Sequence, residues 1–189
     1  MTGLDTLIYS PAVISGNLGT SSSARQLLRA VTGVAESGST NMAMENRSLI
    51  PAAFAETLRH TSAVLMVMRQ ASEDRDFHNK TVRAGETVTL LLAAANHDPR
   101  EYQNPEEFNI FREGLNPAIE LEKYASHSTF ARGRHFCIGS KLAGLEAEIA
   151  ANQLLDAMDD IAFADGIAPK QEGNFVPAPR SFYVMFRPT

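Results

Sequence analysis

The sequence predicts a mainly α-helical chain with small β-sheets, an α+β protein. Two observations support this class: segments with apolar residues at helical spacing recur along the chain, and short runs with the composition of strands separate them. At 189 residues, with 44% hydrophobic and 21% charged residues, the chain has the size and composition of a single globular domain, residues 1–189.

Three segments are predicted to be helical. Residues 5–35 carry apolar positions at helical spacing, and Pro11 is expected to start or kink this helix. A second helix is expected at 50–60, where Pro51 suits the first turn. The third is expected at 138–158. Its predicted apolar face consists of Leu142, Leu145, Ile149 and Leu154.

The rest of the chain is predicted to contain short strands, turns and one long irregular segment. The expected elements are strands at 64–70, 161–163 and 182–186, a turn at 83–86 and an apolar run at 88–95. Residues 97–134 are rich in Pro, Asn, Asp and Gly and show little periodicity. Long irregular segments inside compact domains are usually functional, so we expect a site there.

The composition argues against several classes of protein. A formal charge of -5 gives no reason to expect nucleic acid as a partner. The longest apolar stretch, Val88–Ala95, is too short to span a bilayer, and the first residues lack a signal-peptide pattern. The single cysteine, Cys137, fits a reducing compartment. We therefore expect a cytoplasmic protein without a membrane partner.

The only cysteine lies in the stretch Phe-Ala-Arg-Gly-Arg-His-Phe-Cys-Ile-Gly, residues 130–139. Gly133 permits a tight turn, and Cys137 follows just before an apolar, helix-forming run. Free backbone N–H groups and the positive end of a helix dipole favour a thiolate there. A lone cysteine is more often a small buried hydrophobe, and zinc would require further Cys or His ligands nearby. The position of Cys137 before a helix is one where a thiolate can be held for a metal.

This stretch resembles the heme-ligand loop of the cytochrome P-450 family. The family pattern is Phe, two residues, Gly, one residue, His or Arg, one residue, Cys, one residue, Gly. It is matched by Phe130, Gly133, His135, Cys137 and Gly139. The resemblance implies that the loop, with Ile138, binds heme b (iron protoporphyrin IX), that Cys137 is the axial ligand of the iron, and that His135 contacts a heme propionate. A thiolate ligand pushes electron density toward iron and favours O–O cleavage.

The resemblance continues from about residue 50 to the C-terminus, with the motifs in the family's order. Glu56 and Arg59, at i and i+3 on one helix face, correspond to a structural Glu-x-x-Arg pair that braces the irregular segment before the loop. Arg69 stands where the family has an arginine that contacts a heme propionate, and a guanidinium can bond both oxygens of a carboxylate.

The resemblance implies the fold of the C-terminal, heme-ligand half of a cytochrome P-450. The corresponding parts are a central-helix-like segment at 1–36, the Glu-x-x-Arg helix at 50–60, the irregular segment with the cysteine loop at 97–139, and the proximal helix at 138–158. The N-terminal half of the family fold, which supplies much of the substrate pocket, has no counterpart in this sequence.

Two further positions depart from the family. Its central helix carries an acid and an alcohol that deliver protons during oxygen activation, but Leu18 and Gly19 stand in their places. Thr20 is the candidate for a distal catalytic alcohol, and the alternative is that it belongs to a polar helix face. Glu107 stands where the family commonly has an arginine that joins the Glu-x-x-Arg network, and Arg112 is the candidate replacement.

The resemblance also implies partners. Family members oxidise a small organic substrate with dioxygen and electrons from a ferredoxin or flavoprotein. A basic patch for an acidic donor, or alternatively an ordinary solvated surface, is expected at Arg132, Arg134 and Lys141. Without the N-terminal half, the first helix would expose an apolar face, so we expect a homo-oligomer or a partner that supplies the missing half. That face would consist of Ile8, Val13, Ile14 and Leu18.

Four hypotheses for function remain open at this point. The first is a heme-thiolate monooxygenase, an oxidoreductase of cytochrome P-450 type. The second is a peroxygenase or peroxidase, because hydrogen peroxide brings its own protons and electrons. The third is a non-catalytic heme-binding sensor or partner subunit, and the fourth is a gene fragment that binds no heme. The substrate is not specified by the sequence.

Overall fold

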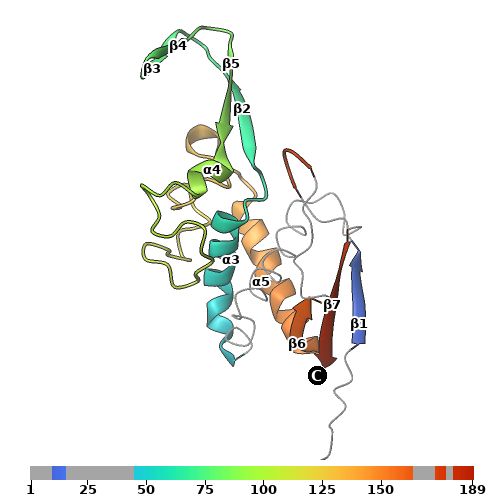
Figure 1. The fold of residues 1–189 in the computed structure, drawn as a ribbon. Helices are drawn as coiled ribbons and strands as arrows, with labels where there is room; N and C mark the ends of the chain where they lie inside the picture. Colours follow the sequence, from blue (N-terminus) through green and yellow to red (C-terminus); the bar gives the residue numbers. More distant parts are fainter. Residues whose placement is uncertain (1–9, 16–44, 164–172, 178–180) are drawn as a thin grey trace, which may run out of the picture.

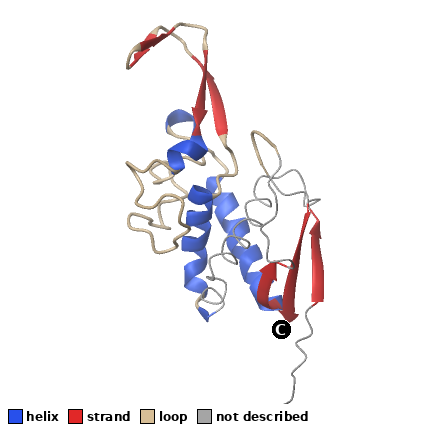
Figure 2. Cartoon of the chain, in the orientation of Figure 1, coloured by secondary structure: helices blue, strands red, loops and turns tan. Residues whose placement is uncertain are grey.

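The structure is a computed structural model that describes residues 10–15, 45–163, 173–177 and 181–189. Its elements in chain order are β1 (Ser10–Ser15), η1 (Arg47–Leu49), α3 (Ile50–His60), β2 (Met66–Gln70), β3 (Arg75–Phe77), β4 (Lys80–Val82), β5 (Thr87–Leu91), α4 (Leu92–Asn96), η2 (Gly133–His135), α5 (Ser140–Ala157), β6 (Met158–Phe163) and β7 (Ser181–Pro188). The helices and small sheets are those of an α+β chain, as the sequence predicts (Figure 1, Figure 2).

Helices α3 and α5 lie side by side in the middle of the molecule (Figure 1). The prediction of a helix at 50–60 is confirmed, with Pro51 in the first turn. Phe54 and Leu58 of α3 pack against Ala143 and Ala147 of α5. Small residues on α5 allow the two helix backbones to approach closely, which places the end of α3 beside the start of α5.

The predicted apolar face of α5 is not the side of the helix that packs in the core. Leu142, Leu145 and Ile149 are 59%, 54% and 50% exposed, whereas the buried positions include Ala143, Gly144 and Ala147. The periodicity correctly places the large apolar residues on one side of the helix. It does not show that the small residues on the opposite side make the contact with α3. The helix itself is confirmed, with bounds close to those predicted.

The C-terminal sheet has the order β1-β7-β6, with antiparallel pairing throughout. The strands expected near 161–163 and 182–186 are confirmed as parts of β6 and β7. The helix expected at 5–35 is wrong for Ser10–Ser15, which form β1. β-branched Val13 and Ile14 favour a strand, and Pro11 is tolerated because β1 lies at the edge of this sheet.

The expected apolar helix face therefore changes. Val13 and Ile14 belong to a strand, and Ile8 and Leu18 lie outside the described residues, as does the rest of the central-helix-like segment. The oligomer expected from that face consequently loses its original support.

Strands β2 and β5 form a two-stranded antiparallel ribbon that projects from the helices, with the β3–β4 hairpin at its far end (Figure 1). The expected strand at 64–70 begins at Met66, and the apolar run at 88–95 is divided between β5 and α4. The expected turn at 83–86 is present, closed by a hydrogen bond from the N–H of Glu86 to the carbonyl of Arg83.

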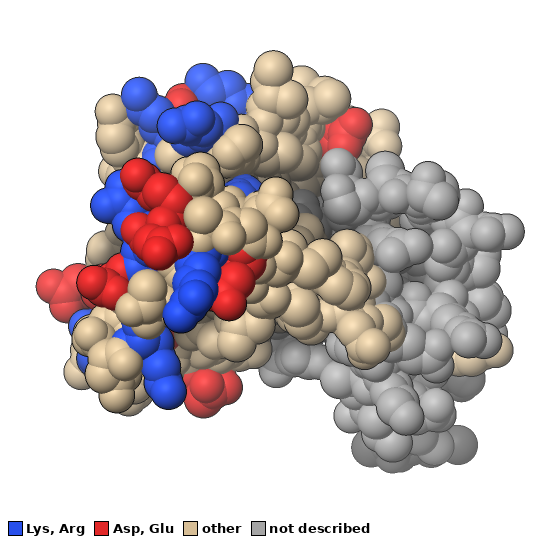
Figure 3. Space-filling model, turned by 90° about the horizontal axis from the view of Figure 1, so that it is seen from above, with Lys and Arg blue, Asp and Glu red and all other residues tan. Residues whose placement is uncertain are grey.

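Residues 97–132 contain neither helix nor strand, as predicted, and they run along one side of α3 (Figure 2). Seen from the end that carries the β3–β4 hairpin, charged side chains of both signs are interspersed (Figure 3). Among the described helices, none combines the length and the apolar character that crossing a bilayer requires.

Candidate functional site

The loop at residues 130–139 is shaped by short-range backbone hydrogen bonds. The N–H of Cys137 donates to the carbonyl of Phe130 at 3.0 Å, and the N–H of Phe136 donates to the carbonyl of Gly133 at 3.2 Å. Ala131 and Gly133 adopt positive φ angles of 60° and 69°, which reverse the chain direction on either side of Arg132. These turns place Cys137 just before Ser140, the first residue of α5.

One end of this loop is buried and the other is exposed. Phe130 packs against Phe54 and Leu58 of α3, and its ring meets that of Phe136 edge-on, with 6.3 Å between centroids. In contrast, Cys137 is exposed, and Ile138 is fully exposed. The loop is therefore anchored in the core through Phe130 and directs its thiol outward.

The surroundings of the sulfur suit a prosthetic group that brings its own ligands. Among the described residues, His, Cys, Asp and Glu form no group of three or more that would hold a metal ion. The loop thus offers one thiol. A Cβ at Gly139 would lie 3.8 Å from the Cys137 sulfur, at ordinary contact distance, so the glycine keeps this side of the sulfur free of a side chain. These features fit heme, in which the porphyrin supplies the remaining in-plane ligands.

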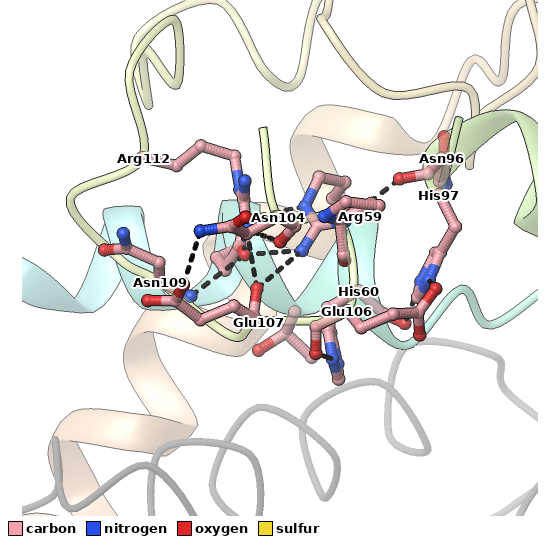
Figure 4. Close-up of polar contacts among 12 residues, drawn as sticks. Arg59, His60, Asn96, His97, Asn104, Glu106, Glu107, Asn109 and Arg112 are labelled. Atoms are coloured by element: carbon pink, nitrogen blue, oxygen red, sulfur yellow. Dashed lines mark hydrogen bonds and ion pairs between the residues drawn. The ribbon is translucent and has the colours of Figure 1, made fainter. Parts of the chain in front are cut away.

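A buried ion-pair network lies beneath the irregular segment (Figure 4). Glu56 and Arg59, both 0% exposed, form a bidentate pair at 2.7 and 2.9 Å. The Nε of Arg112 approaches the same carboxylate at 3.2 and 3.3 Å. The carboxylate also accepts the backbone N–H of Asn109 at 3.0 Å. One carboxylate thereby contacts two buried guanidinium groups, each of which would be very costly to bury without an ionic partner.

The two arginines also gather carbonyl groups from the irregular segment. Arg59 donates to the carbonyls of Asn96 and Pro105 at 3.0 and 2.8 Å. Arg59 and Arg112 both donate to the carbonyl of Glu107, at 3.1 and 2.5 Å. Glu107 therefore contributes its backbone, and Arg112 supplies the second guanidinium that the sequence lacks at position 107. The network holds a segment without helix or strand in a defined path.

A second set of buried contacts ties the start of the cysteine loop to α3. The side-chain amide of Asn96, 0% exposed, donates to the Thr129 hydroxyl at 2.9 Å, and its oxygen accepts the N–H of Ser128 at 2.7 Å. The Thr129 hydroxyl donates in turn to the carbonyl of Leu58. Sequence reasoning missed these residues, although Thr129 stands directly before the motif's Phe130. Hydroxyl and amide groups carry no periodic signal.

His127 and Glu120 form a further buried pair behind the loop. His127 accepts the N–H of Thr129 at Nδ1, and its Nε2 lies 3.7 Å from the Glu120 carboxylate. Among the described residues, Nε2 has no hydrogen-bond partner. Burial lowers the pKa of His127 to about 4, so the imidazole is neutral near pH 7. Its ring contacts that of Phe130, with 5.9 Å between centroids. Sequence reasoning did not identify this pair either.

The other predicted site residues are more dispersed. Arg69 lies half-buried on β2 and donates to the carbonyl of Met68 at 2.8 Å. His135 lies exposed on η2, and no hydrogen bond or ion pair of the described residues joins it to Arg69. Thr20 lies outside the described residues.

Two of the three basic side chains expected near the loop form hydrogen bonds or ion pairs with neighbouring residues. Arg132 donates to Ser126 and Ser128 of the preceding segment, and Lys141 pairs with Glu122 at 2.7 Å. Arg134 is exposed on η2.

The chain matches known proteins along most of its length. The cytochrome P-450 family model matches residues 25–180. The biotin biosynthesis cytochrome P-450 of Bacillus subtilis is 46% identical over 121 residues, which cover 64% of this chain and 28% of that protein. Pulcherriminic acid synthase of Bacillus subtilis is 35% identical over 146 residues, which cover 77% of this chain and 36% of that protein.

Solved structures agree with this match. A substrate-free cytochrome P-450 of Mycobacterium marinum has a TM-score of 0.79 and 30% sequence identity, over 90% of this chain and 42% of that one. A cytochrome P-450 in complex with an acyl carrier protein that carries hexadec-9Z-enoic acid has a TM-score of 0.75 and 35% identity, over 87% of this chain and 40% of that one. The chain therefore spans well under half the length of these relatives. With its cysteine loop, its buried Glu56–Arg59–Arg112 network and a family match over most of its length, the chain belongs to the cytochrome P-450 family.

Proposed function

We propose that this chain is the heme-ligand part of a cytochrome P-450 monooxygenase and that it binds heme b through Cys137. The observation that carries the proposal is the placement of Cys137. It is exposed at the outer end of a loop whose inner end is buried through Phe130 and hydrogen-bonded to α3 through Thr129. A thiol fixed in this way loses little conformational entropy when it binds iron, because the loop is ordered beforehand.

The role of the chain is to hold and orient the heme group. When bound to a thiolate, heme supplies the dioxygen chemistry of the family, which incorporates oxygen into an organic substrate. The residues proposed to hold it are Cys137 as axial ligand, with Ile138 and Gly139 beside the sulfur. His135 and Arg69 are proposed to hold the propionates. Arg69 has a guanidinium suited to a carboxylate, and His135 is exposed close to Cys137.

Turnover is proposed to require further polypeptide. The chain spans 28–42% of the length of the relatives described above, which supports a substrate pocket that includes residues outside this chain. We propose that a partner polypeptide or a second copy completes the pocket. Thr20 is proposed as the distal alcohol. An acidic ferredoxin or flavoprotein is proposed to deliver electrons at the exposed Arg134, next to the heme-ligand loop.

The test is the absorption spectrum of the purified chain after reconstitution with hemin, reduction and addition of carbon monoxide. A strongly red-shifted Soret band is expected, because a thiolate ligand donates electron density to the iron. Cys137→Ala should abolish the shift while the fold is retained, since Cys137 is exposed. His135→Gln is the matched control in the same loop: it should weaken heme retention without moving the band.

The other hypotheses predict different results. Heme binding without the red shift, unchanged in Cys137→Ala, would overturn thiolate ligation and favour a non-catalytic sensor. An absence of heme binding under all conditions would favour a gene fragment. If the shift is present, product formation with hydrogen peroxide that exceeds product formation with an electron donor would identify a peroxygenase.

A further inference from the structure

The backbone of Cys137 is held from both sides. Its N–H donates to the carbonyl of Phe130 at 3.0 Å, and its carbonyl accepts the N–H of Ser140 at 3.3 Å. Phe130 begins the cysteine loop, and Ser140 directly follows the loop as the first residue of α5. Because Cys137 is exposed, burial of its own side chain does not fix it. The position of the sulfur therefore depends on what holds the two ends of the loop.

One stretch of the irregular segment, residues 116–126, contacts the chain just before the loop. The Glu120 carboxylate, on a residue that is 1% exposed, accepts the N–H and the hydroxyl of Ser126 at 2.9 and 3.0 Å. Its other oxygen accepts the N–H of Asn116 at 3.4 Å. One buried side chain thereby joins the two ends of the 116–126 segment and fixes the residue that precedes His127.

The same carboxylate faces His127. Nδ1 of His127 accepts the N–H of Thr129 at 3.2 Å, so the proton of the neutral ring lies on Nε2. Nε2 lies 3.7 Å from the Glu120 carboxylate, and among the described residues it has no hydrogen-bond partner. The His127 ring also contacts that of Phe130, with 5.9 Å between centroids. Glu120 therefore attracts the ring that packs against the first residue of the loop.

The next residue, Leu121, contacts the other end of the loop. Its carbonyl accepts the hydroxyl of Ser140, a residue that is 2% exposed, at 2.8 Å. Its side chain packs against the apolar cluster that contains Phe130. A Cβ at Gly144 would overlap that side chain, so the glycine allows Leu121 to lie against α5. Two adjacent residues of one segment thus reach both ends of the loop.

We propose that Glu120 and Ser140 are positioning residues for the heme-thiolate bond, linked through the 116–126 segment and acting on the two ends of the cysteine loop. The proposal rests on the function proposed above, in which Cys137 binds heme iron, and it adds the residues that set where the sulfur lies. Both lie outside the Phe-Gly-His-Cys-Gly pattern of the loop. Replacing a group that orients a metal ligand commonly lowers metal affinity by about 10- to 100-fold.

The first test measures amide hydrogen exchange of the cysteine loop in the heme-free chain. Glu120→Gln replaces an acceptor oxygen by an NH2 group, and Ser140→Ala removes a hydroxyl donor, so each variant should release one end of the loop. Exchange of the loop amides should become about tenfold faster, while exchange of α3 stays the same. Glu122→Gln is the matched control in the same segment, because its pair with Lys141 at 2.7 Å is accessible to solvent. This control should exchange like the unchanged chain.

The second test uses the hemin-loaded chain after reduction and addition of carbon monoxide. The readout is the share of bound heme that shows the red-shifted Soret band, because a displaced sulfur leaves heme bound without the shift. That share should fall in Glu120→Gln and in Ser140→Ala, but not in Glu122→Gln. Release of hemin to excess serum albumin should also be about tenfold faster in the first two variants. A merely structural role would lower the amount of folded protein without changing the share.

Two results would overturn the proposal. One is loop exchange and a band share in both variants that equal those of the unchanged chain. The other is exchange that rises equally in the loop and in α3 with an unchanged band share, because the two residues would then stabilise the fold as a whole. If Glu120→Gln does not fold, Ser140→Ala decides, since it removes a single hydroxyl. If the unchanged chain shows no red shift, the proposed heme ligation fails, whereas hydrogen exchange still tests whether the loop is positioned in this way.

Discussion

Arg112 and Glu56 lie 56 positions apart in the sequence, yet the Arg112 Nε is 3.2 Å from one Glu56 oxygen and 3.3 Å from the other. Glu56 already pairs with Arg59, so this contact turns a local pair on α3 into a three-residue network. Because both arginines also donate to backbone carbonyls of the irregular segment, the network joins α3 to the chain that leads to the cysteine loop.

The first prediction concerns the charge at the centre of that network. Glu56→Gln keeps the shape of the side chain but leaves two buried guanidinium groups without a counter-charge. The free energy of unfolding should fall by about 3–5 kcal/mol, measured by urea denaturation. Glu73→Gln is the matched control, because the Glu73–Arg75 pair at 2.5 Å is exposed, and it should cost less than about 1 kcal/mol. Equal losses would contradict a special role for the buried network.

The second prediction concerns the hydroxyl of Thr129. Thr129→Val preserves volume but removes a group that donates to the Leu58 carbonyl and accepts from Asn96. We expect a loss of about 1–3 kcal/mol, because two buried polar groups lose their partner. Thr129→Ser retains the hydroxyl and should recover most of that loss. Heme retention after gel filtration should be lower in Thr129→Val than in Thr129→Ser, since Thr129 adjoins Phe130, which anchors the loop. Unchanged retention in Thr129→Val would show that the Thr129–Leu58 hydrogen bond does not position the loop for heme.

The third prediction concerns pH. An unfolded histidine takes up its proton near pH 6.5, whereas folded His127, buried, has a pKa of about 4. Between these values the unfolded state binds more protons, so stability is full above pH 6.5 and falls as the pH is lowered toward 4. The free energy of unfolding should fall by about 3 kcal/mol over this range. Burial also lowers the pKa of His60, which contributes in the same direction.

The measurement is the free energy of unfolding in urea at a series of pH values from 4 to 7.5. His127→Asn should flatten the dependence in this window, leaving the part due to His60. His135→Asn, which replaces an exposed histidine of the cysteine loop, is the comparison protein. A slope that is the same in all three proteins would show that His127 does not titrate in this way. The groups that face His127 are Glu120, Arg132 and Arg59.

The fourth prediction compares two glycines of the cysteine loop. Gly133 has a φ of 69°, where a side chain is strained, so Gly133→Ala should lower the free energy of unfolding by about 1–2 kcal/mol. At Gly139, an added Cβ would make an ordinary 3.8 Å contact with the Cys137 sulfur, so Gly139→Ala should leave thermal stability of the heme-free chain nearly unchanged. Loss of stability in Gly139→Ala alone would contradict this distinction.

Features with local causes could be predicted from the amino-acid sequence alone. Pro51 and the apolar spacing of α3 specify that helix, and Gly85 permits the turn at 83–86. The spacing of Phe130, Gly133 and Cys137 identifies the family. The pairing of Glu56 with Arg59 also follows from helical spacing, because residues at i and i+3 share a face.

Contacts between groups that are distant in the sequence could be identified only from the fold. It selected Arg112 as the third member of the Glu56 network and placed Asn96 on Thr129, and neither contact leaves a periodic trace in the sequence. It also turned Ser10–Ser15 into a strand, because β7 offers hydrogen-bonding groups for pairing that local propensity does not include. On α5 it buried the small residues and exposed Leu145, since close approach to α3 favours small side chains over large ones.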